Sequence, residues 1–338
     1  MAAPIVAGLM AFGMSGRVFH APFLETSPDF TLKAVVERNQ KKAQELYPDV
    51  ISYDAFDELL ADDEIELVVI NTPNYTHYEY AMRALGAGKH VLLEKPAAAT
   101  VAEVTEMYDL ARKVDRKLMV YQNRRWDSGF LSVKEIIESG RLGDLIEVHF
   151  RFDRYKPQPG PKLFKETKEF AANGVAYDLG PHLIDNVIAL FGRPLNFHKV
   201  TASHRDNSEV VDYFQFHMAY PNQVNVYITA GLLIAEHLPA FVIHGKLGSF
   251  VKTRTDVQES QLDAGMMPTD PAYGIEPEGS EGKLVTFDEN GEKQIEWIAS
   301  KKGDYKSLFK AVYHTIRENA LFPVTEEHIA WQLELLEA

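Results

Sequence analysis

The sequence contains no cysteine among its 338 residues. Disulfide bonds and thiolate metal ligands are therefore excluded, and a reducing, cytoplasmic setting fits that absence. No apolar run approaches the roughly 20 residues that a membrane-spanning helix needs. The first residues are apolar, but no lysine or arginine precedes Arg17, so they lack the charged start of a signal peptide.

Positive charge is also scarce, since 35 lysines and arginines stand against 49 aspartates and glutamates, for a formal net charge of -14. Such a chain repels nucleic acid and anionic membrane surfaces, so we expect neither as a partner. Hydrophobic residues make up 46% of the chain. This supplies enough material for two cores, because a single core stops growing at roughly 250–300 residues.

The first 121 residues alternate short apolar runs with helical patterns. The runs, such as ELVVI at 66–70 and VLLE at 91–94, are apolar on both faces rather than alternating. Continuous apolar strands separated by helices are typical of a parallel sheet covered on both sides. We therefore expect residues 1–121 to form a doubly wound, Rossmann-type domain.

After residue 121 the pattern changes to strands that alternate apolar and polar residues, as in IEVHFRF, VDYFQFHMAY and NQVNVYITA. This alternation predicts antiparallel sheet with one face packed and one face free. Helical patterns occupy 127–138, 182–190, 304–319 and 325–335. Residues 122–338 are expected to form an α+β domain on a large, mostly antiparallel open sheet. The segment 264–282, rich in proline, glycine and acids, is expected to be a long loop that is either mobile or functional.

A glycine turn follows the first expected strand, with the sequence AFGMSG at 11–16. It resembles the GxGxxG dinucleotide fingerprint, with alanine in place of the first glycine. Gly13 would let the backbone approach a pyrophosphate, and Gly16 would let the next helix pack on the sheet. The alternative is a plain tight turn between a strand and a helix, and the pattern alone leaves both open.

Glu37 and Arg38 end the second expected strand. A carboxylate at this position can accept the adenosine ribose hydroxyls, which favours NAD. An arginine beside it can pair with the 2′-phosphate of NADP. Glu37 and Arg38 therefore indicate different cofactors, and we expect NAD with a weak preference. The alternative is that Glu37 is an ordinary polar residue at the end of a strand.

Two further strands are expected to end in polar segments, NTPNYTH at 71–77 and EKP at 94–96. Ligands of doubly wound sheets bind beyond the carboxyl ends of the strands. Lys95 can there stabilise the charge that develops on a carbonyl or alkoxide oxygen, and Glu94 can orient it. A surface ion pair at a strand end is the alternative.

The segment YDLGPHLID carries a second constellation, since Asp178 and His182 are four residues apart. Residues i and i+4 share one face of a helix, so the two side chains are expected to meet there. A carboxylate that orients an imidazole makes it a good general base. The alternative is an ordinary helix start, with Asp178 as a capping residue and Pro181 in the first turn.

Taken together, the glycine turn, NTPNYTH, EKP and DLGPH resemble the Gfo/Idh/MocA family of NAD(P)-dependent sugar and polyol dehydrogenases, over the whole chain. The segments NRRWD at 123–127 and VDYF at 211–214 resemble its scyllo-inositol dehydrogenase-like branch. The resemblance implies that Lys95, Asp178 and His182 are catalytic. It also implies a cis bond between Lys95 and Pro96, and a homodimer or homotetramer formed through the open sheet.

Candidate binding residues follow from the motifs and the resemblance. Those for NAD or NADP are Phe12, Gly13, Met14, Ser15, Gly16, Glu37, Arg38, Thr72, Pro73, Asn74, His77, Glu94 and Lys95. Those for substrate are Lys95, Asn123, Arg124, Trp126, Tyr155, Asp178 and His182, with Asp127 as a further candidate. No metal is expected, because a zinc dehydrogenase would need converging ligands that the scattered histidines do not supply.

The expected function is hydride transfer between NAD(P) and a secondary alcohol of a cyclic polyol or sugar. The alternative is a sensor of the same fold that binds NAD(P) without catalysis, as the galactose-pathway repressor of yeasts does. The presence of Lys95, Asp178 and His182 together favours the enzyme. A (β/α)8 barrel is disfavoured, because the later alternating strands do not fit eight βα units.

Overall fold

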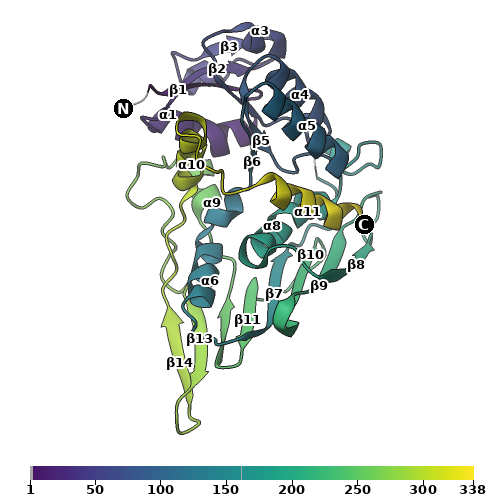
Figure 1. Ribbon diagram of the computed structural model, residues 1–338, viewed down its shortest axis with the longest axis vertical. Coiled ribbons are helices and arrows are strands. Elements are labelled where there is room, and N and C mark those ends of the chain that lie inside the picture. The colour runs from purple at the N-terminus through teal and green to yellow at the C-terminus, as the bar shows by residue number, and fades with distance from the viewer. Residues whose placement is uncertain (1–2, 161) are drawn as a thin grey trace. The chain divides into compact units, whose positions relative to one another are not determined.

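A computed structural model describes residues 3–160 and 162–338, and the chain divides into two units (Figure 1). Unit 1 comprises the chain up to Asn123 together with Gln258–Tyr273 and Asp304–Ala330. Unit 2 comprises Arg124–Val257, Gly274–Gly303 and Trp331–Ala338. The chain thus returns twice to unit 1 after the boundary expected at residue 121.

Unit 1 is built on a parallel six-stranded sheet in the order β3-β2-β1-β4-β5-β6. Its strands are β1 (Ile5–Leu9), β2 (Phe30–Val36), β3 (Ile51–Tyr53), β4 (Leu67–Ile70), β5 (His90–Glu94) and β6 (Leu118–Tyr121). β4 and the centre of β5 are fully buried, as their continuous apolar runs predict. The order reverses at β1, so the turn after β1 lies at the switch point where doubly wound sheets bind ligands.

Helical segments of unit 1 follow most strands. They are η1 (Gly16–His20), α1 (Ala21–Thr26), α2 (Ala43–Leu46), α3 (Phe56–Ala61), η2 (Asn74–Thr76), α4 (His77–Gly86), α5 (Val101–Lys113), α9 (Gln258–Asp263) and α10 (Tyr305–Arg317). α5 begins with a capping box between Thr100 and Glu103, and Asp304 caps α10. Phe309 of α10 stacks on Phe23 of α1 at 4.8 Å, which explains why this late helix belongs to unit 1.

Unit 2 is built on an eight-stranded sheet in the order β14-β13-β12-β11-β7-β10-β9-β8. Its strands are β7 (Leu145–Asp153), β8 (Asn196–Ala202), β9 (Tyr213–Ala219), β10 (Asn225–Gly231), β11 (Phe241–Gly245), β12 (Gly248–Lys252), β13 (Gly282–Phe287) and β14 (Lys293–Ile298). Only the β7–β10 pair is parallel among them. The predicted fold class, a Rossmann sheet followed by a large, mostly antiparallel sheet, is confirmed.

One face of this second sheet is packed and the other is open. Buried Phe150, Phe216 and Ile228 alternate along their strands with half-buried polar residues. The helical segments of unit 2 are η3 (Asn123–Trp126, beginning in unit 1), α6 (Ser128–Glu138), η4 (Leu163–Lys165), α7 (Val175–Asp178), α8 (Gly180–Phe191) and η5 (Pro221–Gln223), and α11 (Glu326–Glu337) runs from unit 1 into unit 2. On the open face, Tyr227 stacks between His149 and His217.

The expected loop at 264–282 is irregular up to Gly282, where β13 begins, and it is anchored rather than loose. In unit 1, fully buried Tyr273 donates a hydrogen bond to Gln258. In unit 2, Glu276 accepts from the Lys252 ammonium at 2.8 Å, and both side chains are almost fully buried. The segment is therefore fixed by a buried side chain in each unit. In unit 2 the loss of either partner would leave a buried charge unpaired, which is strongly destabilising.

Candidate active site

The glycine turn of unit 1 is held in place by Asn71, which directly follows β4. The Asn71 amide accepts from the Ala11 backbone N–H at 3.0 Å and donates to the Ala11 carbonyl at 2.8 Å. Gly16 is obligatory, because a Cβ there would lie 2.2 Å from the Ala11 oxygen. A Cβ on Gly13 would meet nothing within 4 Å. The turn is thus rigid on one side and open at Gly13, which fits the close approach of a dinucleotide pyrophosphate.

Glu94, the last residue of β5, joins the glycine turn to Lys95. Its Oε1 accepts from the Ser15 hydroxyl at 2.7 Å and from Nε2 of fully buried His20 at 2.9 Å, while Oε2 accepts from the Lys95 backbone at 3.3 Å. Burial alone would raise the pKa of Glu94, but the contacts with His20 and Ser15 and the charge of Lys95 outweigh it and lower the pKa to about 2. Glu94 is therefore a fixed anion beside Lys95.

The Lys95–Pro96 bond is cis, which confirms that prediction. The Pro96 carbonyl contacts Nδ1 of His77 at 2.7 Å, and Nε2 of the same ring contacts the Thr72 carbonyl at 3.0 Å. Burial lowers the pKa of His77. The His77 ring therefore holds the two predicted cofactor segments, 71–77 and 94–96, together by contacting one backbone carbonyl in each.

Glu37 has protein partners for both carboxylate oxygens. Oε1 accepts from the Lys42 N–H at 2.9 Å and Oε2 from the Ser52 hydroxyl at 2.7 Å, and the Ala43 N–H lies 3.3 Å from each. The side chain is buried, whereas neighbouring Arg38 is exposed. Glu37 thus fixes the loop between β2 and α2. Because both of its carboxylate oxygens already accept hydrogen bonds from the protein, Glu37 is a weaker candidate for binding the ribose hydroxyls.

Asp178 and His182 of unit 2 do not share one continuous helix, so that expectation is wrong. Asp178 ends α7, and His182 lies in the first turn of α8, which starts at Gly180. The break follows from Pro181, which has no N–H to donate to the carbonyl four residues earlier. Gln332 of α11 donates to the Pro181 carbonyl at 2.8 Å and holds the start of α8 in place.

The Asp178 carboxylate lies between two cations, 3.5 Å from Arg154 and 3.6 Å from Lys165. Asp178 is half-buried, and His182 is buried at 6% exposure. A carboxylate with cations on two sides stays in place without losing its access to solvent, which suits a group that must meet a substrate.

The predicted substrate residues around η3 are positioned by α8. Asp185 of α8 accepts two hydrogen bonds from Arg125, at 2.8 and 2.7 Å. This planar pair fixes η3, whose Arg124 donates to Asp127 at 3.1 Å. Among the remaining substrate candidates, Asn123 is buried in unit 1, Trp126 is half-buried in unit 2, and Tyr155 is 58% exposed in unit 2.

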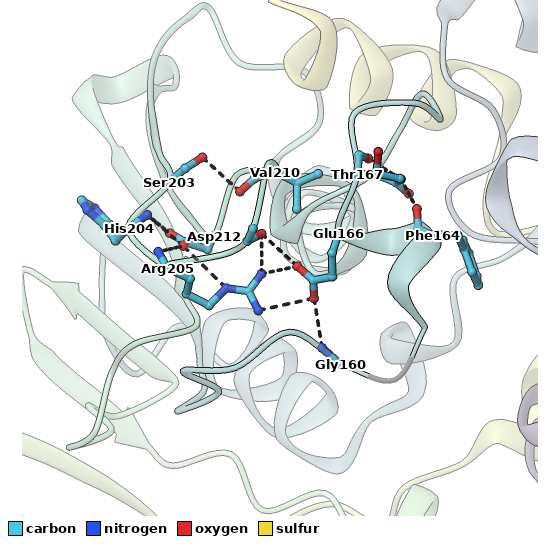
Figure 2. Close-up of polar contacts among 11 residues, drawn as sticks. Gly160, Phe164, Glu166, Thr167, Ser203, His204, Arg205, Val210 and Asp212 are labelled. Carbon is cyan, nitrogen blue, oxygen red and sulfur yellow. Dashed lines mark hydrogen bonds and ion pairs between the residues drawn. The ribbon is translucent and has the colours of Figure 1, made fainter.

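The segment that carries Lys165 is anchored by a buried arginine (Figure 2). Arg205, whose side chain is 2% exposed, donates to Glu166 at 2.6 Å and lies 3.6 Å from Asp212. Asp212 also accepts from the backbone N–H groups of His204 and Arg205 at 2.8 and 2.6 Å. The network ties the residue next to Lys165 to the turn before β9.

Sequence reasoning missed several of these positioning residues, namely Asn71, His20, Arg125 and Arg205. Each acts through a contact with a residue far away in the chain, which no local spacing reveals. A polar residue directly after a buried strand is the one local signal that Asn71 offers. In the described residues no group of three or more histidines or carboxylates is arranged to hold a metal ion. No helix there is long and apolar enough to span a membrane.

A doubly wound parallel sheet with an open glycine turn at its switch point is typical of the class of dinucleotide-binding proteins. The chain matches the model of the oxidoreductase family with an NAD-binding Rossmann fold over residues 5–122, and the GFO/IDH/MocA C-terminal domain over 130–251. The chain belongs to the Gfo/Idh/MocA family, as its motifs predict, and has an NAD(P)-binding Rossmann domain.

Relatives match along nearly the whole chain. The scyllo-inositol 2-dehydrogenase (NADP(+)) IolW of Bacillus subtilis is 35% identical, over 99% of this chain and 92% of its own. The uncharacterized oxidoreductase YhhX of Escherichia coli is 36% identical over 97% and 94%. The crystal structure of an oxidoreductase from Bacillus cereus is 34% identical with a TM-score of 0.88, over 98% of this chain and 95% of that chain.

Proposed function

We propose that the protein reversibly oxidises a secondary alcohol of a cyclic polyol or sugar, using NAD(P). The observation that carries the proposal is that each unit holds its share of the residues proposed to be catalytic in an ordered setting. Lys95 follows the ionised Glu94 in unit 1. In unit 2, Asp178 lies between Arg154 and Lys165, and His182 is buried in the first turn of α8. The similarity to an inositol dehydrogenase supports the same substrate class.

In this proposal His182 takes the hydroxyl proton and Asp178 orients the imidazole ring. The Lys95 ammonium stabilises the negative charge that develops on the substrate oxygen. When bound, the nicotinamide supplies the hydride acceptor. Arg124, Trp126 and Tyr155 are proposed to contact substrate hydroxyls or a ring face.

The proposed function is tested by a cofactor-resolved screen. Purified protein with NAD+ or NADP+ is mixed with inositols, aldoses and anhydro sugars, and the absorbance of the reduced nicotinamide is followed. We expect reduction with at least one cyclic polyol. Calorimetric binding of a dinucleotide with no reduction on any polyol would contradict the proposal and favour the sensor of the same fold.

We further propose that NADP is the preferred cofactor. Glu37 is occupied by the Lys42 and Ala43 backbone and by Ser52, so its carboxylate is turned to the protein rather than to the ribose. Arg38, two residues after β2, and Lys42, directly before α2, are exposed, and cations in this loop can meet a 2′-phosphate. The relative IolW is named for NADP(+), which supports the same preference.

Replacing Arg38 with alanine is expected to lower kcat/KM for NADP+ by about 10–100-fold, because a charge-assisted hydrogen bond contributes about 1.5–3 kcal/mol. The value for NAD+, which has no 2′-phosphate, is expected to change less than about 3-fold. Initial rates with both dinucleotides measure the ratio. An equal loss for both would show that Arg38 supports the loop and not the phosphate.

The open face of the unit 2 sheet supports the proposal of a homodimer or homotetramer. Besides the stacked rings of His149, Tyr227 and His217, it carries exposed apolar side chains at Ile295 and Trp297, which are 51% and 63% exposed. Large apolar and aromatic side chains gathered on one face are typical of subunit interfaces.

A further inference from the structure

His20 of unit 1 is a fully buried histidine whose ring is surrounded by aromatic side chains. Its ring centre lies 4.5 Å from that of Tyr121, the last residue of β6, and 6.2 Å from that of Phe309 in α10. Tyr121 also donates a hydrogen bond to the Phe19 carbonyl at 3.0 Å, which fixes the backbone beside His20. Aromatic rings at these distances attract one another, so the imidazole is held in one place.

Among the residues described, the imidazole of His20 makes its one hydrogen bond with Glu94. Nε2 lies 2.9 Å from Oε1 of Glu94, whereas Nδ1 is buried and has no partner in the part of the chain that the structure describes. His77, by contrast, contacts a backbone carbonyl with each of its ring nitrogens. A buried polar atom without a partner costs stability. A phenylalanine would fill the same aromatic surroundings without that cost, so packing alone does not explain a histidine here.

Glu94 depends on its contact with His20. Oε1 of Glu94 also accepts from the Ser15 hydroxyl at 2.7 Å, and Oε2 accepts from the Lys95 backbone N–H at 3.3 Å. Burial raises the pKa of Glu94, and the strongest effect against it is the hydrogen bond from His20, ahead of Ser15 and the charge of Lys95. Because the carboxylate is ionised, Nε2 of His20 must be the donor. His20 is therefore the main group that keeps Glu94 an anion.

We propose that His20 is a positioning residue for hydride transfer, because it holds the Glu94 carboxylate in place beside Lys95. The inference rests on the proposed function, in which the Lys95 ammonium stabilises charge on the substrate oxygen. An anion favours the charged form of a cation close to it, so a fixed Glu94 keeps the ammonium available. In this role His20 contacts neither substrate nor dinucleotide and acts only through Glu94.

Two variants separate this role from simple packing. His20→Phe keeps an aromatic ring and removes the donor, whereas His20→Gln keeps an N–H donor and removes the ring. We expect kcat to fall about 10–100-fold in His20→Phe and to stay within about 5-fold in His20→Gln. The KM of the polyol and the calorimetric affinity for NADP+ should change less than about 3-fold in both. His90→Phe, at the start of the same strand β5, is the matched control and should keep kcat within about 3-fold.

A double variant tests whether His20 acts through Glu94. In protein that already carries Glu94→Gln, adding His20→Phe should lower kcat by less than about 3-fold more, because the carboxylate that His20 holds is gone. Two losses that simply multiplied would show that His20 acts on the reaction by another route and would overturn the inference.

The ionisation of Glu94 gives a readout that needs no turnover. Carbon-13 NMR of protein labelled at the glutamate carboxyl carbons follows the titration, and the Glu94 signal is assigned by its loss in Glu94→Gln. The wild-type carboxyl, with a pKa of about 2, should stay ionised down to about pH 4. His20→Phe should raise the midpoint by about 1–3 pH units, because burial then meets less opposition, and His20→Gln by less than half of that. The other titratable groups coupled to Glu94 are Lys95 and His77, which all these variants retain.

The outcomes separate this inference from the proposed function. An active wild type with near-normal kcat in His20→Phe would overturn the inference and leave the proposed function standing. A larger loss in His20→Gln than in His20→Phe, in step with the melting temperatures, would also overturn it and show that the ring only packs. If the wild type oxidised no polyol, the proposed function would fail and the titration would decide. A raised Glu94 midpoint in His20→Phe would then support the role of His20 in holding Glu94, and an unchanged one would overturn it.

Discussion

Lys95→Ala is expected to lower kcat at least about 100-fold, the cost of removing one group that stabilises developing charge. Lys95 follows β5 and is half-buried beside Glu94, whose pKa of about 2 keeps it ionised at any working pH. The Lys95 charge is one of the causes that lower the pKa of Glu94, and the alanine variant has no cation to supply in its place. Steady-state rates with the best polyol of the screen measure the loss.

Dinucleotide binding provides the second measurement for this variant. The glycine turn and Asn71 do not depend on the Lys95 side chain, so calorimetric affinity for NADP+ should stay within about 3-fold of the wild type. Lys113→Ala, an exposed lysine at the end of α5, is the matched control and should keep full activity. A Lys95→Ala enzyme with near-normal kcat would rule out the proposed role.

Arg205→Ala is expected to reduce the free energy of unfolding of unit 2 by about 3–5 kcal/mol, the cost of leaving a buried charge without its partner. Asp212 is 1% exposed at its side chain and would keep its charge in the protein interior. Glu166 would also lose the Arg205 contact that, against the effect of burial, lowers its pKa. In Figure 2 the Arg205 guanidinium lies between the Glu166 and Asp212 carboxylates, and no other labelled residue places a cation there.

Tryptophan fluorescence reports this unit directly, because the three tryptophans, Trp126, Trp297 and Trp331, all belong to unit 2. Urea denaturation followed by tryptophan fluorescence gives the change in the free energy of unfolding. Arg193→Ala removes an exposed pair with Glu334 in the same unit and should cost at most about 1 kcal/mol. If both variants lost the same amount, the Arg205 network would contribute no more than a surface ion pair.

Much of the fold could be predicted from the sequence. A strand buried on both faces is a continuous apolar run, whereas a strand buried on one face alternates apolar and polar residues. The run ELVVI became β4, and alternating VDYFQFHMAY became β9. Short β3 was not recognised, since its three residues, ISY, are half-exposed and carry no clear period. The late helix α10 was recognised as a helix, but its place in unit 1 depends on Phe309 stacking on Phe23, a contact that local pattern does not encode.

The local geometry of the candidate site was predictable where it belongs to one short motif. It was not predictable where it depends on contacts between residues far apart in the sequence. The cis bond at Lys95–Pro96 was implied by the family resemblance that the EKP motif helps to carry, and it is confirmed. The shared helix expected for Asp178 and His182 was wrong, because Pro181 breaks the helix between them. Glu37 is occupied in part by Ser52 of β3, a contact between distant residues that sequence spacing does not reveal.

The central claim, that this protein transfers hydride and does not merely bind a dinucleotide, is tested most directly with deuterium. A cyclic polyol or sugar of the screen, labelled with deuterium on its ring carbons, is incubated with the protein and NADP+. The dinucleotide is then analysed by mass spectrometry and NMR. We predict one deuterium at C4 of the reduced nicotinamide, and at least about 100-fold less of it with Lys95→Ala. Tight binding of the dinucleotide with no label transferred from any substrate would contradict the account.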